Sequence, residues 1–148
     1  IIEYLSSIRD KNTTADLAFY AYRDMDRCDW GAFVKASIER NPVALEVFEN
    51  KSLDQIYSNL SQIKSESIYD GNRLATPDEV VNYDTGDGIE KAFVLADVMN
   101  KRNPEQKMRI EIDNSKAVVV SDKRYSFETS KKLDKNIEIS NGRIEVED

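Results

Sequence analysis

Hydrophobic residues in this chain recur at helical spacing up to Pro104 and alternate with polar residues after it. Before the proline, apolar side chains three and four positions apart predict amphipathic helices. After it, Met108, Ile110 and Ile112 alternate with charged residues, as in a strand with one buried face. Helices followed by strands along a chain indicate the α+β class. We therefore expect N-terminal helices, a central buried helix and a C-terminal antiparallel sheet.

Capping residues mark the starts of the helices in the first half of the chain. Ser52 and Gln55 form a capping-box pattern in front of an apolar stripe. Asn41 precedes a proline that suits the first helical turn. The expected helices cover residues 15–25 after Thr13 or Thr14, 30–38 after Asp29, 42–48 after Asn41, and 53–64 after Ser52.

The second half carries the signals of a core domain. Asp70-Gly71-Asn72 is a turn signal, and we expect it to separate a helical extension over 1–70 from a core over 71–148, the two packing as one domain. Thr76-Pro77 opens a short helix, and an apolar helix over about 88–101 is predicted to be buried because hydrophobic residues nearly surround it. Asn141-Gly142 between alternating segments predicts a hairpin in an antiparallel meander.

Composition limits the class of partner. A formal charge of −7 argues against nucleic acid, although the segment from Lys101 to Lys135 holds ten Lys or Arg against six Asp or Glu. No apolar run is long enough for a membrane span. The single cysteine, Cys28, fits a reducing compartment and slightly favours the cytoplasm without establishing it. The chain opens at Ile1 without methionine, so we expect a fragment and conclude nothing from missing targeting signals.

One segment carries a family resemblance. Residues 86–96 read Gly-Asp-Gly-Ile-Glu-Lys-Ala-Phe-Val-Leu-Ala, which resembles the nucleophile helix of the transglutaminase-like superfamily, typically Gly-Asp-Cys-x-[Asp/Glu]-x-Ala. Residues 116–120, Lys-Ala-Val-Val-Val, resemble the family's His-Ala strand, and residues 125–128, Tyr-Ser-Phe-Glu, resemble its aspartate strand. The resemblance covers about residues 73–128 and implies a papain-like core.

The resemblance also implies that the catalytic triad is lost. Its nucleophile position holds Gly88, its histidine position Lys116 and its aspartate position Glu128. The chain contains no histidine at all, so no imidazole can activate a thiol. If the family scaffold is retained, these three positions should lie together. Gly88→Cys with Lys116→His should then restore a reactive thiol at a helix N-terminus.

The resulting hypothesis is a catalytically inactive transglutaminase-like domain that binds or scaffolds a protein or glycan partner, such as an extended peptide. Tyr83, Asp87 and Glu90 are the candidate cleft residues. Two alternatives stay open: an enzyme that uses the carboxylates of Asp87, Glu90 and Glu128, or a purely structural domain of a longer polypeptide. A helix-entry turn capped by Asp87 also explains the Gly-Asp-Gly segment without any site.

We expect no cofactor and no metal. Asp24, Asp26 and Asp29 have the spacing of a calcium loop, but its glycine and distal glutamate are missing.

Overall fold

The computed structural model describes Met25 and residues 29–147 of the 148-residue chain. Cys28 lies outside the described residues, as does the helix expected over 15–25 apart from Met25. The indole of Trp30 donates a hydrogen bond to the carbonyl of Met25 at 2.9 Å.

The described helices begin where the capping patterns predict them. Ser52 and Thr76 both close capping boxes, and Asp29 accepts a hydrogen bond from the Ala32 amide. Asn41 differs from the expectation, because its side-chain amide donates back to the carbonyls of the preceding helix. The helices are α3 (Trp30–Glu39), α4 (Pro42–Val47), α5 (Leu53–Gln62), α6 (Pro77–Tyr83) and α7 (Gly88–Arg102).

Helix α7 is the centre of the molecule. Its residues from Gly88 to Met99 are buried all round, as the sequence predicts. Helices α3, α4, α5 and α6 contact it, and so do strands of the sheet. The Phe33 and Phe93 rings meet edge to face at 5.6 Å, joining α3 to α7. Helix α7 therefore contacts both the other helices and the sheet.

The strands form a single antiparallel sheet in the order β3-β2-β1-β4-β5. Asn141 and Gly142 take positive φ values of 52° and 75°, so the predicted hairpin is confirmed. The strands are β1 (Met108–Ile112), β2 (Lys116–Val120), β3 (Arg124–Glu128), β4 (Lys135–Ser140) and β5 (Arg143–Glu147).

The expected meander is only partly correct. β1, β2 and β3 follow one another, but β4 returns to pair with β1 instead of β3. The outer edge of β3 faces α5, where the Tyr57 hydroxyl donates to the carbonyl of Ser126 at 2.8 Å. Because α5 lies on the outer edge of β3, β4 pairs instead with the edge of β1 that β2 leaves free.

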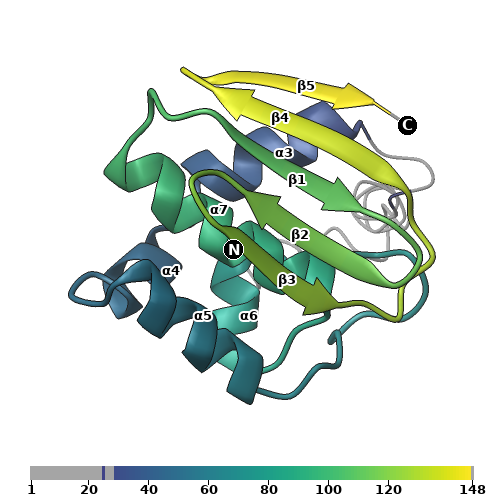
Figure 1. Ribbon diagram of the computed structural model, residues 1–148. Helices are drawn as coiled ribbons and strands as arrows, with labels where there is room; N and C mark the ends of the chain where they lie inside the picture. Colours follow the sequence, from purple (N-terminus) through teal and green to yellow (C-terminus); the bar gives the residue numbers. More distant parts are fainter. Residues whose placement is uncertain (1–24, 26–28, 148) are drawn as a thin grey trace, which may run out of the picture.

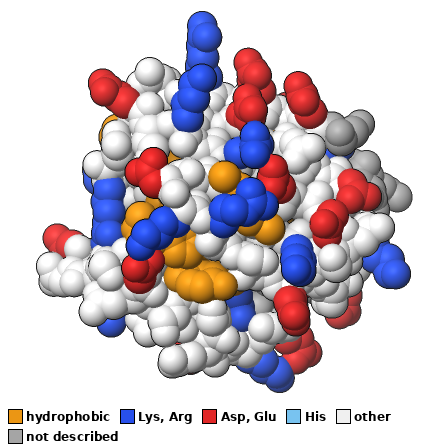
Figure 2. Space-filling view, viewed as in Figure 1, with side chains coloured by type: hydrophobic (Ala, Val, Ile, Leu, Met, Phe, Trp, Pro, Cys, Tyr) orange, Lys and Arg blue, Asp and Glu red, His pale blue; other side chains and the backbone are white. Residues whose placement is uncertain are grey.

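The sheet is covered on one face. Figure 1 shows α3 and α7 behind the sheet, with α4, α5 and α6 beyond its β3 side. Figure 2, from the same direction, shows acidic and basic side chains mixed over the uncovered face. Buried residues of the helices and of the strands belong to one hydrophobic core. Within the described ranges, no helix combines the length and apolar character that crossing a membrane requires.

Candidate functional site

The start of α7 is the position that the family resemblance assigns to a nucleophile, and β3 runs directly against it. A Cβ added to Gly88 would overlap the carbonyl oxygen of Glu128. It would also lie 2.6 Å from the carbonyl carbon of that residue and 3.1 Å from the Cβ of Phe127. Backbone atoms cannot rotate away as a side chain can. Glycine is therefore required at 88 by the close approach of the strand.

Lys116 and Glu128 lie opposite each other as cross-strand partners in β2 and β3. Their neighbours Ala117 and Phe127 are buried against the helices, and successive side chains of a strand point to opposite faces. The side chains of Lys116 and Glu128 therefore point to the open face, away from α7. No ion pair joins them in the part of the chain that the structure describes.

The backbone thus brings the three positions together, while the side chains of two of them point away from the third. This geometry is at odds with the expectation that Gly88→Cys with Lys116→His would restore a reactive thiol. The thiol would have no room beside Glu128, and the imidazole would begin on the opposite face of the sheet.

Asp87 is buried, with 2% of its surface exposed, and both carboxylate oxygens are occupied. Oδ2 accepts from the Ile89 amide at 3.0 Å and from the Thr129 hydroxyl. Oδ1 accepts from the Ser130 amide at 3.0 Å and from its hydroxyl at 3.3 Å. Asp87 is therefore the N-cap of α7 and ties the segment after β3 to the helix.

Glu90 is fully buried and completes the capping box. Its Oε1 accepts from the Asp87 amide at 2.8 Å. Its Oε2 accepts from the Ser67 hydroxyl and from the Ala75 amide, both at 2.6 Å. Burial raises the pKa of the Glu90 carboxyl, although these hydrogen bonds oppose the shift. Glu90 holds the long connection between α5 and α6 against α7.

Two buried lysines complete this polar group. Lys131 donates to the carbonyls of Tyr69 and Gly71, and Lys91 donates to the carbonyl of Ile63 at 3.0 Å. Lys91 also donates to the Ser65 hydroxyl at 2.9 Å. Burial lowers the pKa of both ammonium groups, and the carboxylate of Asp87 opposes the shift at each of them.

Tyr83, the third candidate cleft residue, does not join this group. Its side chain is 64% exposed at the end of α6. The structure therefore brings Asp87 and Glu90 together and leaves Tyr83 on the surface.

The residues that surround the carboxylates of Asp87 and Glu90 were not among the site residues expected from the sequence. The sequence could have indicated Lys91, since a charged residue within a helix of buried apolar residues needs a partner. Asp97 carried the same signal further along α7. Ser67, Thr129, Ser130 and Lys131 had no local signal, because only the folded chain brings them to the start of α7.

The chemical capacity of the group is small. Every carboxylate oxygen of Asp87 and Glu90 accepts a hydrogen bond, and both side chains are buried, so neither carboxylate is presented to a substrate at the surface. Among the residues that the structure describes, no group of three or more His, Cys, Asp or Glu is placed to hold a metal ion. The linings of five hollows on the surface of that part do not include Gly88, Asp87 or Glu90.

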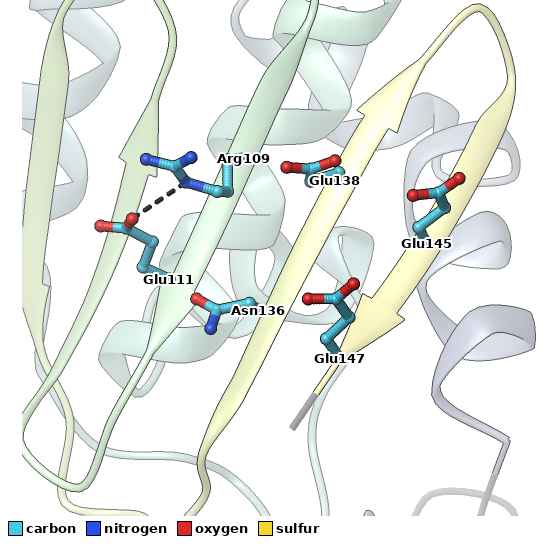
Figure 3. A pocket seen from close by; sticks show the side chains of 6 residues that line it. All are labelled: Arg109, Glu111, Asn136, Glu138, Glu145 and Glu147. Carbon is cyan, nitrogen blue, oxygen red and sulfur yellow. Dashed lines mark ion pairs between the residues drawn. The ribbon is translucent and has the colours of Figure 1, made fainter.

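One of these hollows lies on the open face of the sheet. Figure 3 shows acidic side chains of β1, β4 and β5 around it, with the guanidinium of Arg109 2.9 Å from Glu111. Glu138 and Glu145 are direct cross-strand neighbours of like charge, which destabilises a sheet. The lining consists of Arg109, Glu111, Asn136, Glu138, Glu145 and Glu147.

No family model, curated protein or solved structure matches this chain.

Proposed function

We propose that this chain is a catalytically inactive transglutaminase-like domain that serves as a binding or scaffolding module for a protein partner. The observation that carries the proposal is the position of β3 at the start of α7. The carbonyl of Glu128 occupies the space that the side chain of a nucleophile would need at residue 88.

The charged residues around Gly88 support the same proposal. Asp87, Glu90 and Lys91 hold two segments of the chain onto α7 through hydrogen bonds: the connection between α5 and α6, and the residues after β3. Lys131 joins these two segments to each other. A catalytic carboxylate must instead reach a proton on a substrate. The alternative of an enzyme that uses Asp87, Glu90 and Glu128 gains no support from this arrangement, since two are buried and the third faces the open side of the sheet.

Activity measurements on the unmodified protein test the proposal. The purified chain is incubated with p-nitrophenyl acetate, and separately with a glutamine-containing peptide and a fluorescent primary amine. We expect no ester hydrolysis and no amine incorporation above the rates with heat-denatured protein. Turnover by the native protein that persists in Cys28→Ser would overturn the inactive assignment.

A variant at residue 88 tests the structural half of the proposal. Gly88→Ala should destabilise the fold by about 2 to 3 kcal/mol, because the added methyl group must displace the backbone of β3. Gly31→Ala is the matched control, since its Cβ meets only the carboxylate end of Asp29, at 3.3 Å, and alanine favours a helix. Urea denaturation measures both. Equal stability of the two variants would mean that β3 does not fill the site in solution.

A further inference from the structure

A hollow of about 530 Å³ lies between the ends of α4, α5 and α6. Its apolar lining includes Phe48, Leu60 and Val80, which are buried in the core. Val47 also lines it and remains 48% exposed. The volume falls in the range of pockets that bind ligands, about 300 to 1,000 Å³. Apolar and polar residues both line this hollow, whereas charged residues and one asparagine line the hollow on the sheet face.

Hydrogen bonds within the chain join two of the helices that surround the hollow. The Gly86 amide donates to the carbonyl of Lys64 at 3.0 Å, and the Thr85 hydroxyl donates to the carbonyls of Lys64 and Glu66. These bonds fix the end of α5 to the end of α6. A site that is formed before binding costs less conformational entropy when a ligand enters.

The charges at the hollow oppose those of the whole molecule. Lys51, Lys64 and Asp84 line it, so two positive groups face one negative group in a chain of net charge −7. No ion pair involves Lys51 within the described ranges. Lys64 pairs with Glu66 at 2.9 Å, but both side chains are about two-thirds exposed, and such a pair is weak enough to exchange.

The acidic hollow in Figure 3 has the opposite preference. Four glutamates against one arginine would repel an acidic ligand there. The two hollows therefore differ in the sign of the charge that prevails in their linings.

We infer that the hollow between α4, α5 and α6 docks a peptide segment of a partner protein, with bulky apolar side chains next to acidic ones. This inference depends on the proposed function, because it assigns the binding module its docking surface. The apolar side chains cover Val47 and fill the space above Leu60 and Val80. The acidic residues lie beside the ammonium groups of Lys51 and Lys64.

Binding of three defined peptide pools tests the inference. Each pool consists of fluorescein-labelled ten-residue peptides. The first has central positions drawn from Leu, Ile, Phe and Met between glutamate flanks. The second replaces the glutamates with lysines, and the third replaces the apolar positions with serine. Fluorescence polarisation of the unmodified protein should show binding of the first pool, with at least about fivefold weaker binding of the other two.

Variants of the lining locate the binding. Lys51→Glu and Val47→Asp should each weaken binding of the first pool about fivefold or more. Their matched controls are Lys132→Glu, an exposed lysine, and Ile68→Asp, an apolar residue that is 37% exposed; neither lines the hollow. The controls should leave the affinity unchanged. Circular dichroism of the four variants is the control for folding.

The outcomes separate the inference from the proposed function. Absence of binding by the first pool, or equal binding of all three pools, overturns the inference. So does binding of the first pool that Lys51→Glu and Val47→Asp leave unchanged. Stronger binding of the lysine-flanked pool would also overturn the inference and would indicate binding at the acidic hollow on the sheet face. In each of these cases, absence of turnover in the activity assays still upholds the inactive assignment. Turnover that persists in Cys28→Ser overturns that assignment, whichever pools bind.

Discussion

Asp97 is the residue whose environment is most unusual for its type. It lies in α7, is fully buried, and neither carboxylate oxygen has a hydrogen-bond partner among the described residues. Burial raises its pKa to about 8, and the nearby carboxylate of Asp78 adds to the shift. The folded protein therefore keeps a proton on Asp97 at pH 7, where an unfolded chain has released it.

This proton makes the stability of the fold depend on pH. The carboxyl of Asp97 ionises near its ordinary pKa of 3.8 in the unfolded chain and near 8 in the folded one. The contribution of Asp97 to stability is therefore fully present below about pH 4 and declines as pH rises towards 8. Above pH 8 both states have lost the proton, so the loss no longer grows.

Asp97→Asn should remove this decline, because an amide cannot ionise. We expect the variant to match the unmodified protein at pH 4 and to exceed its stability at pH 9 by at least about 1 kcal/mol. Urea denaturation at pH 4, 7 and 9 measures the difference. Asp122→Asn, at an exposed carboxyl, provides the control. A difference for Asp97→Asn that is the same at all three pH values would contradict the prediction.

At the scale of elements, α5 is joined to the sheet at the β3 edge. The Tyr57 hydroxyl donates to the carbonyl of Ser126, and its ring lies 5.1 Å from that of Tyr125 and 5.2 Å from that of Phe127. The Tyr125 hydroxyl in turn donates to Asp54 at 2.8 Å. The aromatic contacts of Tyr57, together with its hydrogen bond to the carbonyl of Ser126, fix the position of α5.

Replacing Tyr57 should therefore destabilise the fold. Tyr57→Ala is expected to cost about 2 to 3 kcal/mol, mainly through the lost ring contacts with Tyr125 and Phe127 and to a smaller extent through the lost hydrogen bond. Tyr83→Ala is the matched control, because that tyrosine is 64% exposed, and its cost should stay within about 0.5 kcal/mol. Thermal denaturation compares the two. Similar melting temperatures for both variants would show that α5 does not depend on Tyr57.

At the scale of the whole molecule, the helical first half and the sheet share one core. Buried residues from α3 to α5 belong to the same cluster as those of α7 and the strands. Lys135 on β4 lies 5.8 Å from the centre of the Trp30 ring on α3. The boundary expected near residue 70 divides the sequence, but the hydrophobic core continues across it.

A shared core predicts cooperative unfolding. Trp30 is the only tryptophan, so its fluorescence follows the first half of the chain. Far-UV circular dichroism follows helices and strands together. The two urea transitions should coincide in midpoint and slope, as for a two-state domain. Separate midpoints would show that the region before residue 70 unfolds independently.

Features that depend on neighbouring residues could be predicted from the sequence. The capping boxes at Ser52 and Thr76, the buried helix over 88–102 and the hairpin at Asn141-Gly142 follow from local hydrogen bonding, local backbone angles and periodicity. These interactions span only a few residues, so their pattern is visible in a short segment of sequence.

The meeting of distant segments became visible only in the folded chain. Folding pairs β4 with β1, turns Lys116 and Glu128 to the open face, and places the backbone of β3 against Gly88. Asp87 and Glu90 were recognisable as polar residues at a helix start, but their use as buried anchors depends on Ser130 and Ala75. Such contacts arise from the balance of burial and pairing over the whole chain, which no local pattern encodes.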